Sequence, residues 1–167
     1  NASFVNSKIN AIVGRSGSGK STIIKIVLGL LSSPNGNVLI NDQDIKKINL
    51  SLLRNNIGYV PQEPLIFNES LWNNITLWSE VNDKNKHKFF KLVKIIDIDF
   101  INLQNDDIFK KNLGDFGNAI SGGQKQKIAL LRELFKEPKI LILDEPARSL
   151  DSKNEQKFYE ILNLQEN

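Results

Sequence analysis

The sequence of 167 residues contains no cysteine, no methionine and a single histidine. Because cysteine is absent, disulfide bonds and thiolate metal sites are excluded, and a reducing compartment is permitted. No stretch approaches the roughly 18 apolar residues that a membrane-spanning helix requires, so any membrane part must lie on other sequence. Without a methionine, Asn1 is not a native start, and we expect the chain to be a piece of a longer protein.

A strong excess of one charge is also lacking. The chain has 22 basic and 19 acidic residues, a net charge of +3, and the two signs are interspersed. A nucleic-acid-binding domain would gather its lysines and arginines on one face, so no nucleic-acid partner is expected. The length, together with 40% hydrophobic residues, indicates one soluble globular domain.

Short apolar runs alternate with helical patterns along the chain. Strands that are unrelieved by polar residues and separated by helices predict a parallel α/β sheet flanked by helices. The middle of the chain, from about residue 68 to 119, is mostly helical and is expected to be an insertion. The expected strands are residues 8–13, 37–40, 57–60 and 139–143, and the expected helices are residues 20–31, 81–96, 122–135 and 152–164.

A glycine-rich segment, GRSGSGKS at residues 14–21, fits the pattern G-x-x-x-x-G-K-[ST] between an expected strand and an expected helix. Glycines let the backbone form a concave nest whose N–H groups face a phosphate, and the helix adds its positive dipole end. In this pattern Lys20 reaches the β- and γ-phosphates and Ser21 contacts Mg²⁺. The nucleotide-binding residues expected here are Gly14, Arg15, Ser16, Gly17, Ser18, Gly19, Lys20, Ser21 and Thr22. A chance glycine-rich turn is the alternative, and the flanking elements disfavour it.

Two carboxylates, Asp144 and Glu145, follow the apolar run 139–143. Ligands of parallel sheets bind beyond the carboxyl ends of the strands, which is where this pair would lie. Asp144 is suited to hold Mg²⁺ through its water shell, and Glu145 to orient and deprotonate an attacking water. The alternative is a solvated acidic turn at the end of a strand.

Four further segments identify a family. Residues 120–124, ISGGQ, resemble the LSGGQ motif of ABC ATPases with Ile in place of Leu. Residues 60–62 resemble the glutamine loop of that family, residues 144–146 its Walker B segment, and residues 149–151 the end of its D-loop. The resemblance implies a P-loop NTPase (RecA-like) parallel sheet with an inserted α-helical subdomain. Its core would comprise residues 1–67 and 129–167, and its helical subdomain residues 68–128.

The resemblance also implies a head-to-tail dimer, in which ATP and Mg²⁺ lie between the phosphate loop of one copy and the SGGQ segment of the other. The residues acting in trans would be Ser121, Gly122, Gly123, Gln124 and Asp151. The implied catalytic residues are Lys20, Gln62 and Glu145, and the implied metal contacts are Ser21, Gln62 and Asp144. Gln62 would sense the γ-phosphate and couple it to rotation of the helical subdomain.

Residues 62–75 and 113–117 are similar to exporter-type members. This similarity implies a transmembrane partner and a location at the cytoplasmic face of the cell membrane, with this segment itself soluble. Trp72 would lie either in the groove that receives the membrane domain or inside the helical subdomain.

Two other functions stay open. A soluble ABC ATPase acting on DNA or ribosomes is disfavoured, because residues 63–120 hold no sustained heptads and only one such domain is present. The other is a fragment that binds nucleotide without turnover. It is suggested by the lack of an aromatic residue well upstream of Lys20, by Ala147 and Arg148 in the D-loop region, and by a sole histidine, His87, that precedes Ser121.

Overall fold

The computed structural model describes residues 2–6, 8–33, 35–96, 98, 107–114 and 120–146. In these residues no helix has the length and the apolar character needed to cross a bilayer. The helices and strands are, in chain order, α1 (Lys20–Val27), β1 (Leu39–Ile40), β2 (Gln43–Asp44), the 3₁₀ helix η1 (Ile45–Lys47), α2 (Leu50–Asn56), β3 (Ile57–Val60), α3 (Leu71–Thr76), α4 (Asp83–Ile96), α5 (Asp107–Lys110), α6 (Gly122–Phe135) and β4 (Ile140–Leu143).

The central element is a parallel pair of strands, β3 and β4, which pair from Ile57 opposite Ile140 to Val60 opposite Leu143. Backbone hydrogen bonds continue past both ends of the pair, from Lys139 N to Asn56 O and from Asp144 N to Val60 O, each 2.9 Å long. This small parallel sheet with flanking helices agrees with the expected α/β class. A second, antiparallel pair of β1 and β2 was not predicted.

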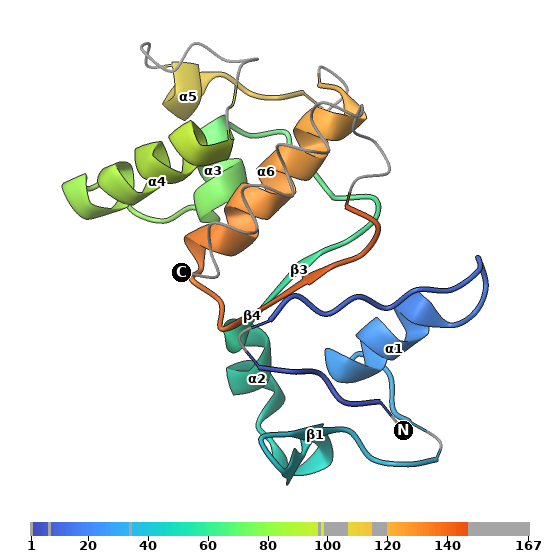
Figure 1. Cartoon of the computed structure of the whole chain (residues 1–167). Coiled ribbons are helices and arrows are strands. Elements are labelled where there is room, and N and C mark those ends of the chain that lie inside the picture. The colour runs from blue at the N-terminus through green and yellow to red at the C-terminus, as the bar shows by residue number, and fades with distance from the viewer. Residues whose placement is uncertain are drawn as a thin grey trace.

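Side chains of the parallel pair alternate between two hydrophobic clusters, as the two-residue period of a strand requires. On one face, Ile57, Tyr59 and Ile142 pack with residues of α1, η1 and α2. On the other face, Val60, Leu141 and Leu143 pack with residues of α3, α4, α5 and α6. Figure 1 shows these two groups of helices on opposite sides of β3 and β4.

Helix α6 forms the middle of the larger cluster, with most of its residues from Gln126 to Phe135 buried. Trp72 of α3 is only 2% exposed, and its ring lies 5.1 Å from that of Phe89 and 5.2 Å from that of Phe109 between centroids. Such aromatic pairs stabilise a core beyond their buried area. Trp72 is therefore a core residue rather than part of an exposed groove.

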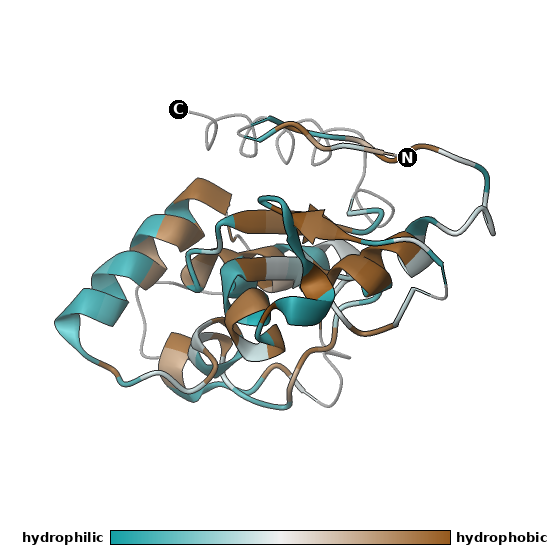
Figure 2. Cartoon of the chain, turned by 90° about the horizontal axis from the view of Figure 1, so that it is seen from below, coloured by the Kyte–Doolittle hydropathy of each residue, from teal (hydrophilic) through white to brown (hydrophobic). Residues whose placement is uncertain are grey.

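The helix expected at residues 122–135 is confirmed as α6, and the strand expected at 57–60 as β3. The helix expected at 20–31 ends early, at Val27, because Gly29 takes a left-handed conformation with φ of 64°. The helix expected at 81–96 begins at Asp83, because Asn82 Oδ1 caps it by accepting a bond from Asn85 N, 2.9 Å long. Figure 2 shows the hydrophilic first turns and hydrophobic last turns of α4.

Two further strands were expected. The run 139–143 is confirmed as β4 from Ile140, and only residues 39–40 of the expected strand 37–40 are a strand. The short elements β2, η1, α2, α3 and α5 were not predicted. The helix expected at 152–164 lies outside the described residues.

The strand expected at residues 8–13 is wrong, because this segment forms no strand and Val13 is 90% exposed. The side chain of Asn10 bonds the local backbone instead: it accepts from Val5 N at 3.0 Å and donates to Val5 O and Lys8 O at 2.9 Å. Side chains of this type compete with a sheet for backbone groups.

Close packing at Gly58 gives a first test. A Cβ atom there would lie 2.9 Å from Pro138 Cγ, 3.0 Å from Leu141 Cδ1 and 3.2 Å from Glu133 Cβ. We expect Gly58→Ala to lower the free energy of unfolding by about 1–3 kcal/mol, the usual cost of overpacking. Denaturant unfolding would measure it. The control Lys139→Ala, at an exposed position, should stay within about 0.5 kcal/mol of wild type. Equal stability of Gly58→Ala and wild type would contradict this packing.

Candidate functional site

The loop before α1 has the backbone shape of an anion-binding nest. Gly17 and Gly19 have φ of 78° and 92°, in the left-handed region that favours glycine. The space next to both is open, since an added Cβ would meet no atom within 4 Å. Gly14 gives room to the Ser18 side chain, because a Cβ there would lie 2.7 Å from Ser18 Oγ and that hydroxyl would have to turn away. The loop is thus built by glycine at three positions.

Lys20 closes the loop from inside. Its Nζ donates to Gly14 O at 2.9 Å and to Arg15 O at 3.1 Å. An ammonium group has three N–H donors, so one remains for a ligand. The two bonds hold the positive charge beside the loop before any ligand arrives, which lowers the cost of ordering the side chain on binding.

The first turn of α1 is also suited to an anion. Its N-cap residue, Gly19, makes no side-chain capping bond, and the turn carries no acidic residue. Backbone N–H groups at such a helix start and the positive end of the dipole attract negative charge. The loop residues from Gly14 to Ser18 are exposed. Loop and helix together therefore fit a phosphate group.

A second group of predicted residues meets at the carboxyl ends of β3 and β4. Because Val60 pairs with Leu143, Gln62 and Glu145 leave the sheet side by side. Gln62 Nε2 donates to Glu145 Oε2 at 2.7 Å. Glu145 is exposed and has a left-handed φ of 50°, a conformation that is uncommon for a residue with a side chain. Strained backbone of this kind concentrates at functional sites.

Asp144 is 7% exposed, and Tyr59 on the neighbouring strand lies against it. Burial raises the pKa of Tyr59, and the charge of Asp144 and a hydrogen bond to it raise that pKa further. Tyr59 therefore stays protonated at neutral pH and donates its hydroxyl to the carboxylate. Sequence reasoning missed Tyr59, because nothing local tells that it lies beside Asp144.

The SGGQ segment forms the start of α6. Ser121 Oγ accepts from Gln124 N at 3.3 Å, and Gln124 Oε1 accepts from Ser121 N at 2.7 Å, which is a complete capping box. Gly122 and Gly123 form the first turn between them. Figure 1 shows this end of α6 well apart from the loop before α1.

The predicted residues thus fall into three places. Residues 14–22 are shaped by local contacts, Gln62, Asp144 and Glu145 meet at the end of β3 and β4, and Ser121 to Gln124 begin α6. Asp151 lies outside the described residues. His87 is exposed on α4. No group of three or more His, Cys, Asp or Glu side chains suited to a metal ion occurs in the described part of the chain.

Comparisons with known proteins find relatives along most of the chain. Residues 1–148 match the family model described as ABC transporter. A Rickettsia typhi protein whose name describes an export ATP-binding/permease protein is 45% identical over 157 residues, which are 90% of this chain and 27% of that protein. The mitochondrial iron-sulfur clusters transporter of Yarrowia lipolytica is 39% identical over 161 residues, which are 95% of this chain and 22% of that protein.

Among solved structures, a bacterial Atm1-family ABC exporter with ATP bound has a TM-score of 0.81 and 29% sequence identity. The match covers 92% of this chain and 26% of the exporter. The chain therefore spans about a quarter of the length of these three relatives.

The contact between Tyr59 and Asp144 gives a test that depends on pH. We expect Tyr59→Phe to lower the free energy of unfolding at pH 7 by about 0.5–1.5 kcal/mol, because the buried carboxylate loses a donor. The folded-state pKa of Tyr59 lies above its ordinary value of 10.0. The contribution is therefore complete below about pH 10 and lost as pH rises through the folded-state pKa.

Denaturant unfolding at several pH values would measure the difference in free energy of unfolding between wild type and Tyr59→Phe. This difference should be constant from about pH 7 to 9 and become smaller at higher pH. In an Asp144→Asn background, Tyr59→Phe should cost less. A difference that grows above pH 10 would contradict the assignment.

Proposed function

This chain belongs to the ABC transporter family, and we propose that it is the ATP-hydrolysing domain of an exporter. The observation that carries the proposal is the glycine loop closed by Lys20, whose Nζ donates to Gly14 O and Arg15 O. In a chance glycine-rich turn, a lysine ammonium group would not be expected to bond the carbonyl groups of the turn at the start of a helix.

In this proposal the loop and α1 hold the triphosphate of ATP. The residues concerned are Gly14, Arg15, Ser16, Gly17, Ser18, Gly19, Lys20, Ser21 and Thr22. Ser21, Gln62 and Asp144 would hold Mg²⁺, which neutralises phosphate charge when bound. Tyr59 fixes the carboxylate of Asp144 through its hydroxyl.

Glu145 is the proposed general base. It orients a water for in-line attack on the γ-phosphorus and accepts the proton of that water as the new P–O bond forms. The bond from the γ-phosphorus to the bridging oxygen breaks, and ADP leaves. Gln62 supports this step, because its amide holds the Glu145 carboxylate at 2.7 Å and so restricts the directions in which the carboxylate can point.

Closure of the site requires a second copy of the chain. One chain carries two helix starts suited to phosphate, at α1 and α6, and they lie well apart (Figure 1). We propose that Ser121, Gly122, Gly123, Gln124 and Asp151 of a second copy close over the nucleotide in a head-to-tail dimer. A two-fold arrangement makes two such sites at once, so ATP joins the copies and hydrolysis separates them.

We also propose a division into a core of residues 1–67 and 129–167 and a helical subdomain of residues 68–128, whose helices α3, α4 and α5 share one hydrophobic cluster with α6 and β4. The membrane partner would be the transmembrane domain of the same exporter, which would place this domain at the cytoplasmic face of the cell membrane. Export rather than a soluble function is supported by the names of similar proteins, among them an iron-sulfur clusters transporter.

Lys20→Ala tests the nucleotide site. In the full-length protein we expect it to lower the rate of ATP hydrolysis about 100- to 1000-fold, because a positioned positive group is lost from the phosphates. Affinity for ATP, measured by equilibrium binding, should fall as well. Lys25→Ala is a matched control, since Lys25 is an exposed lysine on the same helix. Unchanged affinity in Lys20→Ala would refute the site.

Glu145→Gln tests the dimer. The amide still accepts the bond from Gln62 but cannot take a proton, so we expect ATP to trap the dimer and raise the mass seen by light scattering of the purified ATPase domain. Adding Ser121→Asp should abolish the rise. Aspartate caps a helix as well as serine, but its charge repels the triphosphate.

Ser121→Asn is the neutral control, because asparagine caps α6 without adding charge. It should weaken the dimer less than Ser121→Asp does. A dimer that forms equally well in all three proteins would mean that Ser121 does not meet the nucleotide.

A further inference from the structure

We infer that Arg132 of α6 is a positioning residue. Its hydrogen bonds to the loop of residues 62–67, called here a grip on that loop, keep Gln62 beside Glu145. This inference rests on the proposed function, because it assigns Arg132 a part in hydrolysis at the same site. Arg132 does not belong to the motifs that identify the family in the sequence, and it lies more than three turns of α6 beyond Ser121.

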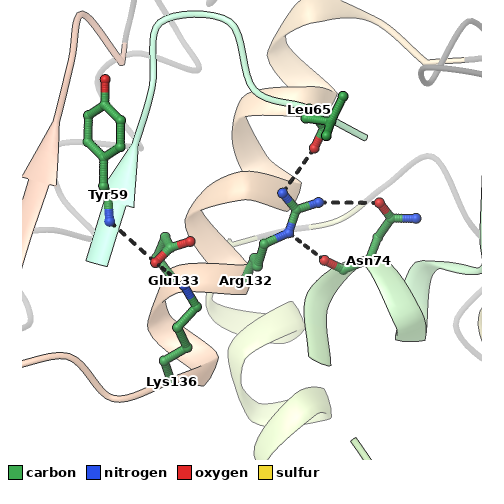
Figure 3. A network of polar contacts seen from close by, with 6 residues as sticks. All are labelled: Tyr59, Leu65, Asn74, Arg132, Glu133 and Lys136. Carbon is green, nitrogen blue, oxygen red and sulfur yellow. Dashed lines mark hydrogen bonds and ion pairs between the residues drawn. The ribbon is translucent and has the colours of Figure 1, made fainter. Parts of the chain in front are cut away.

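The guanidinium of Arg132 joins two separate segments (Figure 3). Its Nη1 donates to Leu65 O at 2.9 Å, its Nε donates to Asn74 O at 2.7 Å, and its Nη2 donates to Asn74 Oδ1 at 3.3 Å. The guanidinium carbon also lies 5.1 Å from the ring centroid of Phe67, within the range of a cation–π contact. One side chain thus links the far end of the loop to α3.

Asn74 completes this grip from α3, and it is fully buried, with 0% exposure. Its Oδ1 accepts from Phe67 N at 2.9 Å, and its Nδ2 donates to the carbonyl oxygens of Phe67, Glu69 and Ser70 at 3.0–3.2 Å. The turn from Phe67 to Ser70 is therefore fixed to the same side chain that Arg132 bonds.

Gln126 grips the near end of the loop, six residues earlier on α6. Its Nε2 donates to Gln62 O at 2.8 Å and to Pro61 O at 3.4 Å. Gln126 is 1% exposed, and its Oε1 has no hydrogen-bond partner in the described part of the chain. A buried amide oxygen without a donor is unfavourable, so the bond from Gln126 to Gln62 is kept at a cost in stability.

Helix α6 is itself anchored to the sheet beside these grips. Glu133 Oε2 accepts from Tyr59 N at 3.3 Å and from Lys136 Nζ at 2.6 Å (Figure 3). Since Tyr59 lies in β3, which leads directly into the loop, the position of α6 sets where the loop begins and where it ends. Gln62 lies between those points and reaches Glu145 from there.

Arginine is required by the geometry rather than by charge alone. A planar guanidinium offers donors in several directions at once, whereas a lysine offers one compact ammonium. Burial lowers the pKa of Arg132, and the charge of Glu133 raises it; arginine nevertheless stays protonated in proteins. Lysine at this position would keep the charge over Phe67 but lose the simultaneous bonds to Leu65 and Asn74.

The test uses the full-length protein and a double-mutant cycle of Arg132→Lys with Gln62→Ala. We expect Arg132→Lys to lower kcat for ATP hydrolysis on the order of tenfold or more, because small displacements of a catalytic arrangement have large effects on rate. KM for ATP should change by less than about twofold, since loop 14–20 is untouched and Ser21 and Asp144 would still hold Mg²⁺ in the proposed function. With Gln62→Ala already present, Arg132→Lys should lower kcat by no more than about twofold.

The matched control is Arg54→Lys. The guanidinium of Arg54 also donates to two backbone carbonyl oxygens, of Leu28 at 3.3 Å and Gly29 at 2.9 Å, but these bonds join α2 to the end of α1, on the other face of the sheet. Its kcat should stay within about twofold of wild type. If the fold-decrease in kcat of the double variant equalled the product of the decreases in Arg132→Lys and Gln62→Ala, the inference would be overturned. Arg132 would then act independently of Gln62.

A second variant covers the case in which Arg132→Lys fails to fold. Gln126→Met removes the near grip together with the unpaired oxygen while keeping the volume, so the core should tolerate it. It should show the same loss of kcat at unchanged KM, and the same absence of further loss in Gln62→Ala. An unchanged kcat in Gln126→Met would overturn the inference.

Hydrogen exchange separates this inference from the proposed function. Arg132→Lys should speed exchange of the Phe67 and Asn74 amides about tenfold or more, with amides of α1 unchanged. If Lys20→Ala hydrolysed ATP like wild type, the proposed function would be wrong. Hydrogen exchange in Arg132→Lys would still show whether Arg132 fixes the loop. Unchanged exchange at Phe67, with hydrolysis dependent on Lys20, would overturn the grip alone.

Discussion

The parallel pairing of β3 with β4 is the constraint on which the rest of the structure depends. Its register brings together Gln62 and Glu145, 83 residues apart in the chain, at a distance of 2.7 Å. Its two faces also separate the two hydrophobic clusters, so each group of helices is fixed relative to the same four-residue strands. A shift of one residue would turn every side chain of the shifted strand to the other face and pull the polar pair apart. Stability and site geometry therefore have one origin.

The surface of α6 that packs on β3 and β4 is mostly apolar but includes a few polar side chains. Gln126 bonds the loop of residues 62–67, and Arg132 bonds both that loop and α3. Glu133 bonds β3. Apolar packing supplies most of the free energy of folding but has little direction. Buried hydrogen bonds restrict position, because leaving a partner unpaired is unfavourable. The apolar residues of α6 thus hold it on the sheet, and its polar residues set where the loop lies.

Sequence patterns found what is local and missed what is not. The glycine loop, the helix at 122–135 and strands 57–60 and 139–143 depend on neighbouring residues, and the structure has each of them. The strand expected at residues 8–13 failed, because an apolar run cannot show which edge will pair with it and Asn10 bonds the local backbone first. Tyr59 and Arg132 were missed because their partners are distant; Leu65 and Arg132 are 67 residues apart. Trp72 stayed undecided until its ring partners were known.

The same distinction separates nucleotide binding from turnover. The shape of loop 14–19 comes from glycine conformations and from Lys20, all within seven residues, and it forms although the segment before it is not a strand. In the proposed mechanism hydrolysis needs more: Glu145 is held by Gln62, and this contact depends on the β3–β4 register and on the loop that α6 bonds. A change that disturbs α6 can therefore remove turnover and leave binding intact. On this proposal, both a fragment that binds ATP without hydrolysing it and an active domain are compatible with the arrangement, and the contact that would distinguish them is the one between Gln62 and Glu145.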